Sequence, residues 1–248
     1  MGLKVITPPT AEPVSLAEMK NHLRLYQGEQ WRDGAEYKEC DMVIGTDGNS
    51  YVATSDHTAA SATKPITGED YETVWELHTD DEDTLIQNLI TAARKYAEHT
   101  YCHRTFPVQT LEYSISSFPY EIKLPRPPVI DIVSFKVKVY DGTDLDDLVE
   151  DEDFIVDYEA EPAIIVPAPG KVWPCEKLYP LNSIRIRYEA GYTDVPEPIK
   201  YWIMLLVAHY YENRQAILPM GHNIMRTPYG IDWLIDGYRV FDWRPDEE

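Results

Sequence analysis

Two stretches of the sequence have the periodicity of amphipathic helices, and a long segment without that periodicity separates them. This interruption is the feature that most limits which folds the chain can adopt. Residues 15–25 begin with Ser15 and Glu18, a capping box in which both side chains satisfy free backbone N–H groups at a helix start. A second capping box, at residues 79–82, precedes apolar residues that recur at the three-and-four spacing of one helix face. We therefore predict helices over residues 15–25 and about 80–101, which form a hairpin interrupted by an insertion at residues 27–77.

The insertion has the composition of a small β module. It is rich in Gly, Asp, Thr and Ser and carries single, widely spaced aromatic residues. Residues 42–44 and 50–53 flank a Thr-Asp-Gly-Asn sequence at residues 46–49, which is typical of a β-hairpin turn. We predict a small β fold whose core is mostly aromatic.

The middle of the chain, residues 107–192, has the pattern of strands. Runs of alternating or β-branched residues are separated by Pro and Asp-Gly breaks, as in a small antiparallel sandwich or barrel. The Pro-rich stretch at residues 125–128 should lie at an edge or a crossing, because proline cannot donate a hydrogen bond to a strand ladder.

The last third of the chain returns to helix and then to an aromatic tail. Pro196 and Pro198 precede residues 199–215, which are apolar almost all round, as in a helix at the centre of a bundle or between subunits. We therefore predict an α+β fold: a helical core (1–26, 78–106 and 193–248), the inserted β module (27–77) and an antiparallel β domain (107–192).

Charge and composition exclude several classes of function. The 248 residues include 43 acidic and 22 basic side chains, a formal charge of −21, so stable docking on nucleic acid is excluded as the main function. The three cysteines form no CxxC motif, which argues against a zinc knuckle or a disulfide framework. The longest apolar run, near residues 201–211, is shorter than the about 20 residues that cross a bilayer, so we expect no membrane partner and a soluble, cytosolic protein.

Residues that carry chemistry do not form a recognisable site. His99, Cys102 and His103 lie at one helix end, but a third nearby ligand is absent. The acidic loop at residues 141–147 lacks the glycine that an EF-hand requires. No GxSxG, HExxH, P-loop or GxGxxG motif occurs. For His209 and Glu212 we expect a buried histidine whose hydrogen bond is satisfied within its own helix. We predict no enzyme, no catalytic residue, no metal and no cofactor, with a hydrolase of unrecognised site as a distant alternative.

The order of the motifs resembles one known family. Four groups of residues carry this resemblance. The first comprises residues 6–9, 12–18 and 23–25, and the second comprises residues 80–81, 85–86 and 92–98. The third comprises residues 124–128 and 188–196, and the fourth comprises residues 199–200 and 206–214. Together they resemble the head–tail connector (adaptor, or head-completion) proteins of tailed phages and prophages.

This resemblance implies a structural role in the virion neck. Such a subunit forms a ring, typically of twelve copies, under the portal protein, binds a stopper or tail-completion protein, and leaves a channel through which DNA passes transiently. It is assembled in the host cytoplasm. Acidic side chains along that channel would repel phosphates, so we expect an acidic lumen.

The resemblance also assigns the aromatic tail. In this family the C-terminal segment reaches into the portal, and exposed aromatic residues in a tail without its own core are usually binding anchors. The expected portal-binding residues are Trp233, Leu234, Tyr238, Arg239, Phe241 and Trp243. The alternative is that this tail folds back onto the chain's own helices.

The insertion resembles the small aromatic modules of chitin- and cellulose-binding type. In such modules rings stack on sugar faces, and Trp31, Tyr37 and Trp75 are the candidate residues here. These three side chains could instead form the module's core. A carbohydrate-binding surface or decoration protein is therefore the alternative function.

Overall fold

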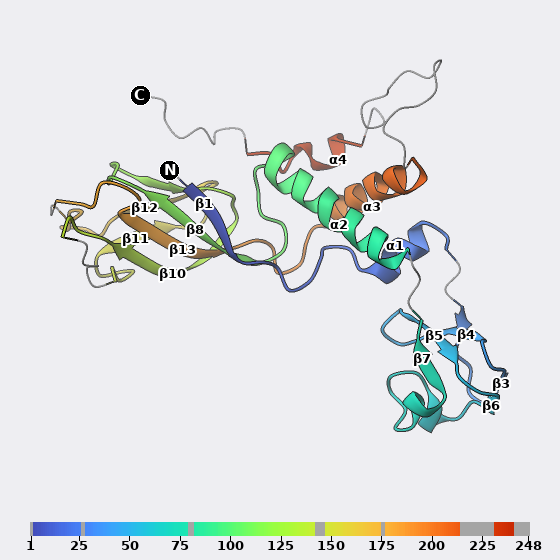
Figure 1. Ribbon diagram of the computed structural model, residues 1–248. Helices are drawn as coiled ribbons and strands as arrows, with labels where there is room; N and C mark the ends of the chain where they lie inside the picture. The colour runs from blue at the N-terminus through green and yellow to red at the C-terminus, as the bar shows by residue number, and fades with distance from the viewer. Residues whose placement is uncertain are drawn as a thin grey trace, which may run out of the picture. The chain divides into compact units, whose positions relative to one another are not determined.

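The structure, a computed structural model, describes residues 2–25, 28–78, 82–141, 147–174, 177–213 and 231–240. Figure 1 shows a mixture of helices and antiparallel sheets, which confirms the predicted α+β fold. The chain forms two compact units. One comprises Met1–Pro13, Arg94–Trp202 and Arg226–Glu248, and the other comprises Val14–Ala93 and Ile203–Met225.

The first unit contains two antiparallel sheets around one core. The four-stranded sheet has the order β1 (Gly2–Thr7), β8 (Gln109–Ile115), β13 (Ile184–Ala190) and β10 (Val129–Val137). The three-stranded sheet has the order β11 (Phe154–Asp157), β12 (Ala163–Pro167) and β9 (Ile122–Leu124). All neighbouring strands in both sheets are antiparallel, as the strand patterns predicted.

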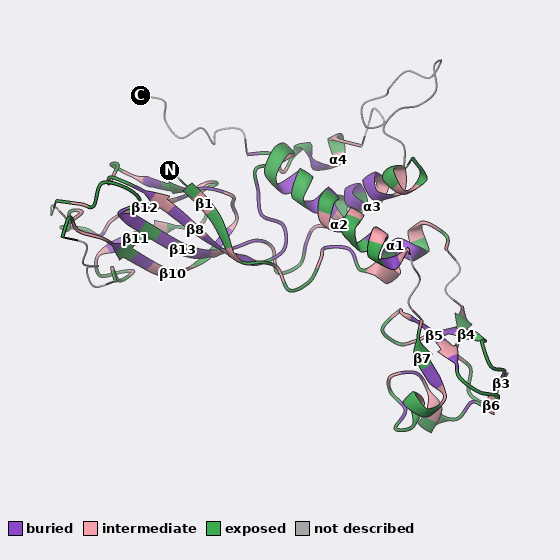
Figure 2. Ribbon diagram, viewed as in Figure 1, coloured by how far each residue is buried: buried purple, intermediate pink, exposed green. Residues whose placement is uncertain are grey.

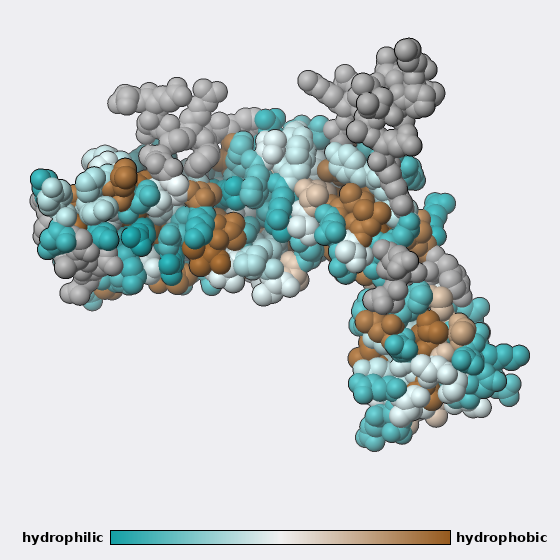
Figure 3. Space-filling view, viewed as in Figure 1, coloured by the Kyte–Doolittle hydropathy of each residue, from teal (hydrophilic) through white to brown (hydrophobic). Residues whose placement is uncertain are grey.

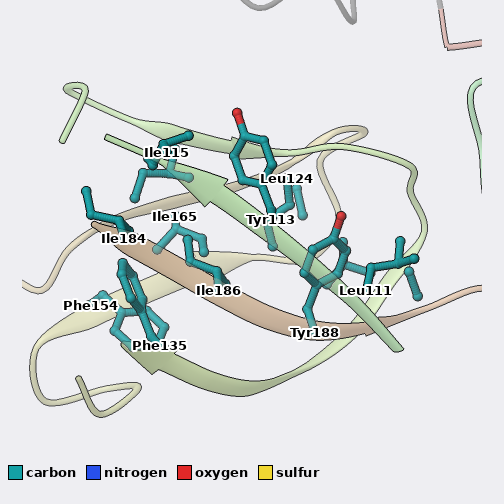
Figure 4. Close-up of a cluster of buried hydrophobic side chains, with 14 of the residues drawn as sticks. Leu111, Tyr113, Ile115, Leu124, Phe135, Phe154, Ile165, Ile184, Ile186 and Tyr188 are labelled. Carbon is teal, nitrogen blue, oxygen red and sulfur yellow. The ribbon is translucent and has the colours of Figure 1, made fainter. Parts of the chain in front are cut away.

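The core between the two sheets follows from alternation along the strands. In β8 and β13 every second side chain is buried, and these side chains face residues of the three-stranded sheet such as Phe154 and Ile165. Figure 4 shows the labelled side chains of both sheets pointing into the space between them, and Figure 2 shows the buried positions alternating with exposed ones. The hydroxyl of Tyr188 donates to the carbonyl of Pro125 at 2.6 Å, so the one polar atom of that buried ring is satisfied.

Strand β1 differs from the sequence-based division of the chain. Residues 1–26 were expected in the helical core, but Gly2–Thr7 pair with β8 and extend the four-stranded sheet. This strand is short and largely exposed, so it has little of the apolar alternation that marks a strand in a sequence. Its partner, β8, lies more than a hundred residues further along the chain.

Two bulges interrupt strand β10, which is an edge of the four-stranded sheet. The register against β13 shifts between Val129 and Asp131 and again between Ile132 and Ser134. Ile130 and Val133 are therefore the extra residues of the two bulges. Bulges bend an edge strand and increase its twist.

The predicted helices are present with small differences at their ends. Helix α1 covers Leu16–His22, and Ser15 and Glu18 form the predicted capping box. Helix α2 covers Asp83–Tyr96 and continues as a π-helical turn, η3, over Ala97–Tyr101. Most of the second predicted capping box, residues 79–81, lies outside the described residues.

Helix α3 covers Glu197–Glu212 and is buried on one side within the chain. The fully buried residues recur at helical spacing: Ile199, Trp202, Ile203, Leu206 and Val207. On other sides Tyr201 and Tyr210 remain exposed. None of the helices in the described ranges is long and apolar enough to span a membrane.

The inserted module, within the second unit, has its own sheets and core. Its strands β2 (Glu29–Gln30), β4 (Met42–Ile44), β5 (Ser50–Ala53) and β7 (Trp75–Leu77) form one sheet, while β3 (Glu36–Tyr37) pairs with β6 (His57–Thr58). The short 3₁₀ helices η1 (Ser61–Thr63) and η2 (Tyr71–Thr73) lie between β6 and β7. The predicted hairpin is confirmed, since β4 and β5 pair antiparallel across the turn that contains Gly48 at φ +81°.

Candidate interaction surfaces

The residues considered for catalysis or metal binding do not converge in space. Among the residues that the structure describes, no group of three or more His, Cys, Asp or Glu side chains could hold a metal ion. A guanidinium nitrogen of Arg126 lies 3.1 Å from Nε2 of His99. Burial, together with the charge of Arg126, lowers the pKa of His99 to about 4. A neutral imidazole beside a guanidinium is a poor place for a further cation.

The other two members of that sequence cluster differ in exposure. The Cys102 thiol is fully buried, and burial raises its pKa to about 12, so the nucleophilic thiolate is absent at neutral pH. His103 is exposed and has a positive φ of 52°.

The described part of the C-terminal tail, residues 231–240, docks on the end of α2 and on α3. Helix α4 covers Trp233–Asp236, and within it Ile235 is fully buried. The Val240 N–H donates to the carbonyl of Cys102 at 2.9 Å, and the indole N–H of Trp202 donates to Asp232 at 3.3 Å. Residues 231–240 therefore fold back onto the chain's own helices, which is the alternative given in the sequence analysis.

One buried arginine holds the docked tail to the rest of the first unit. Arg104 donates from Nε to the carbonyl of Tyr238 at 2.9 Å and from Nη1 to the hydroxyl of Tyr192 at 2.8 Å. Its two Nη atoms also form a bidentate pair with the carboxylate of Glu161, with 2.7 Å for the Nη1 bond. The Arg104 side chain is only 6 % exposed and that of Glu161 is 44 % exposed, so these charge-assisted bonds are shielded from water at the guanidinium but not at the carboxylate.

Sequence reasoning did not identify Arg104. Its partners come from the loop before β12, from the segment after β13 and from the tail, and no local pattern links these positions. Hydrophobic periodicity identifies helices and strands, but it does not indicate which residues a single arginine after a helix end will contact. Only the arrangement of the strands and the tail brings these groups together.

A second buried network fixes the chain at the end of α2. Arg94 binds Glu12 at 2.6 Å and Glu98 at 2.7 Å. The fully buried Glu98 also accepts from the backbone N–H of Phe106 at 2.9 Å. Burial raises the pKa of Glu98, while Arg94 and the Phe106 N–H oppose that rise. This network ties the segment before α1 to the turn before β8.

The tail residues expected to bind a partner differ in exposure. Trp233 is 69 % exposed, whereas Leu234 and Tyr238 are half-buried. Arg239 is exposed, and its guanidinium lies 4.8 Å from the ring centre of Tyr101. Phe241 and Trp243 lie outside the described residues. Within residues 231–240, Trp233 is thus the large apolar side chain that faces solvent.

The three module aromatics also occupy different environments. Tyr37 and Trp75 are buried and meet edge to face with ring centres 5.2 Å apart. The indole N–H of Trp75 donates to the carbonyl of Thr63 at 2.8 Å, and the Tyr37 hydroxyl accepts from the Arg32 N–H at 2.9 Å. Trp31 is half-buried, with the ammonium of Lys64 5.7 Å from its ring centre. Only Trp31 therefore keeps ring surface open to solvent.

Comparison with known proteins gives a likeness of fold. No protein-family model matches the sequence, and no curated protein matches it either. The fold, however, has solved relatives. A chain of the virion of a native gene transfer agent (GTA) particle is 16 % identical, covers 99 % of both chains and has a TM-score of 0.61. A chain of the neck of an empty GTA particle with C6 symmetry is 17 % identical, covers 100 % of both chains and has a TM-score of 0.60.

The two likenesses extend over the whole chain. They include the β-sandwich, the helices and the inserted module together. At 16–17 % identity they establish a shared fold.

Proposed function

We propose that this chain is a structural virion protein of the neck, a head–tail connector subunit that forms a ring under the portal. The observation that carries the proposal is the match of the complete fold, over 100 % of both chains, to a chain of a GTA particle neck. The sequence motifs resemble the same class of protein independently of that match. In this role the chain is not an enzyme, and its partners are further copies of itself, the portal protein and a stopper or tail-completion protein.

The exposed aromatic residues fit such an assembly. Tyr201 and Tyr210 of α3 and Trp233 of α4 are exposed in the single chain. Large apolar side chains on a surface mark interfaces, and tryptophan and tyrosine contribute most of the binding energy in many of them. A ring subunit that also binds a portal needs several such surfaces.

The test is capture of the purified chain by portal rings from the same particle. We expect the full chain to bind and to form a ring with a central channel, visible by electron microscopy, in the virion neck. Twelve copies are the number that the family resemblance implies. A chain that does not associate with portal rings or with assembled particles would contradict the proposed function.

The role of the tail needs variants that leave the docked segment intact. Truncation after Val240 removes Phe241 and Trp243 but keeps the buried Ile235 and the contacts of Arg104. We expect this truncation and Trp233→Ala each to weaken portal binding, with Trp31→Ala in the inserted module as the matched control. If both variants bind as the full chain does, the tail is not the portal anchor.

A second candidate function is supported by one observation. Trp31 lines a cavity of about 280 Å³ together with Gln30, Ile44 and Lys64 of the inserted module. A half-exposed indole beside polar groups is suited to stacking on a sugar ring. The alternative is therefore a carbohydrate-binding decoration protein. Binding to chitin or cell-wall glycans that Trp31→Ala abolishes would support it, and absence of binding to a glycan panel would exclude it.

A further inference from the structure

The outer face of the four-stranded sheet is cationic over half its length. The register places Gly2, Ser114, Arg185 and Lys136 in one row across the sheet, and Lys4, Glu112, Arg187 and Ser134 in the next. Four of the side chains in these two rows are basic and one is acidic.

These cations are only partly neutralised. Arg187 pairs with Glu112 at 2.6 Å, and Lys136 lies 3.7 Å from Asp147. Arg185 is exposed and makes no ion pair within the described ranges. Towards the other end of the strands, Asp131 and Glu189 lie opposite each other. The cationic part is therefore a local feature of a chain whose formal charge is −21.

In the opposite sheet of the same sandwich, the segment that contains the edge strand β11 is acidic. Residues 150–161, which include β11, contain seven acidic side chains and no basic one. Asp157 and Glu159 are exposed at this sheet, while Glu161 is engaged by Arg104. Two lysines lie beside acidic residues of this region: Lys123 of β9 is 3.4 Å from Glu121, and Lys171 is 3.3 Å from Asp153.

Both outer faces also carry aliphatic side chains. On the three-stranded sheet Ile155 is 38 % exposed and pairs with Val166. On the four-stranded sheet the bulge residues Ile130 and Val133 are 43 % and 52 % exposed. In Figure 3 hydrophobic residues appear on the sandwich as small patches within a mainly hydrophilic surface. Contact with a second protein surface would remove these aliphatic side chains from water.

The two faces lie on opposite sides of one core, so they cannot meet within a chain. A contact between them must join two chains, and it is heterologous, because each chain contributes a different surface. Repetition of a heterologous contact around an axis closes a ring. Opposite charges on the two faces reduce the repulsion between subunits that are each strongly acidic.

We propose that the β-sandwich binds the β-sandwich of a second copy, with the cationic four-stranded face of one against the acidic β11 segment of the three-stranded sheet of the next. This inference deepens the proposed ring function and rests on it. DNA is a poorer occupant, because the four cations cover only part of the face, one of them, Arg187, is paired with Glu112, and the bulge residues are apolar.

Cysteine cross-linking tests the contact in the assembled complex. In a Cys40→Ser, Cys175→Ser background, Arg185→Cys and Ile155→Cys place one thiol on each face. With portal rings present, a bismaleimide should convert the double variant into a ladder of covalent oligomers. A mixture of the two single variants should stop at dimers, and each single variant alone should stay monomeric. A control pairs Arg185→Cys with Glu72→Cys in the inserted module and should give no ladder.

The outcomes separate the two proposals. Failure of every variant to bind portal rings would overturn the proposed function. Portal binding without a ladder, or dimers from a single variant alone, would overturn only the face-to-face contact.

A charge exchange supplies a second readout. Arg185→Glu should weaken assembly about fivefold, the effect of about 1 kcal/mol at an exposed ion pair, and addition of Glu159→Lys should restore it. Both side chains are exposed, so folding should be unchanged in circular dichroism. If Arg185→Glu abolishes retention on DNA-cellulose while assembly is unaltered, the cationic face binds nucleic acid and the proposal is wrong.

Discussion

At the scale of single residues, Arg104 connects positions that are 57, 88 and 134 residues away along the chain. Its removal leaves the Tyr238 carbonyl and the Glu161 carboxylate without their donor. We expect Arg104→Ala to lower the free energy of unfolding of the first unit by about 2 kcal/mol, the usual range for hydrogen bonds to a charged group. Urea unfolding measures this loss, and hydrogen exchange should rise in residues 231–240. Arg32→Ala, at an exposed module residue, is the control and should have no effect.

The same ion pair makes stability depend on pH. Hydrogen bonds from Arg104 lower the pKa of Glu161 below its ordinary value of 4.5. Because the folded-state pKa is the lower one, the stabilisation is present above pH 4.5 and is lost as the pH falls through the folded-state pKa. Urea midpoints measured from pH 6 down to pH 3 should fall less steeply in Glu161→Gln than in the unmodified chain. Identical slopes would contradict this role.

Residue roles could be predicted only where they are local in sequence. Ser15 and Glu18 are three positions apart, and their mutual capping follows from that spacing. The partners of Arg104 and Arg94 come from distant segments, and a charged residue in a sequence does not indicate which opposite charge it meets. Tyr37 and Trp75 could be assigned to a core or to a ligand site, because an aromatic residue suits both.

At the scale of elements, the start of α1 depends on its capping box. Ser15 accepts from the Glu18 N–H at 3.2 Å, and the Glu18 carboxylate accepts from the Ser15 N–H at 2.7 Å. Ser15→Ala should destabilise the helix by about 1 kcal/mol, while Ser15→Asp should keep most of the cap. Amide exchange in residues 16–22 measures the difference. Equal exchange in both variants would show that packing alone holds the helix.

The inserted module should depend strongly on one side chain. Trp75 is buried between Tyr37 and His57, so Trp75→Ala leaves a cavity that costs about 3–5 kcal/mol. In so small a core this loss should unfold the module while the β-sandwich stays folded. Limited proteolysis should then cut within residues 28–78, whereas Trp31→Ala should remain resistant. A protease-resistant Trp75→Ala variant would contradict this account.

Element types were predictable where periodicity is sustained. Strands β8 and β13 alternate without interruption, and α2 keeps one apolar face over its length. The bulges of β10 and the π-helical turn after α2 could not be predicted, since each inserts one residue without a change in composition. Strand β1 was missed because its stability comes from pairing with β8 and little from its own burial.

At the scale of the whole molecule, the formal charge of −21 leads to a prediction that rests on the proposed function. In the assembled neck we expect Asp and Glu side chains to line the channel, because a negative wall repels phosphates and lets the duplex slide. A cryo-EM map of the particle identifies the lumen residues. A lumen lined mainly by Lys and Arg would refute this expectation.

The order of the elements in the fold agrees with the order of the sequence motifs, although sequence identity to the GTA chains is low. The order of the elements was recognisable from the sequence, and the same order is preserved at 16–17 % identity in the GTA chains. The order of helices and strands can be kept at low identity because the buried positions of a strand or helix accept one apolar residue in place of another. The pairing of surface charges is not constrained in this way, and so it could not be predicted.

The connections of the β-sandwich have a mechanical consequence. The chain leaves the four-stranded sheet at Thr7, enters it at Gln109 and leaves again at Ala190, and the strand register brings these three points to one end of neighbouring strands. A force that separates these connections therefore acts at one end of the paired strands. In antiparallel strands loaded at the same end, the ladder hydrogen bonds break one after another from that end, whereas loads at opposite ends would put all of them under shear together. Under tension the four-stranded sheet should therefore open first at the end that holds Thr7, Gln109 and Ala190.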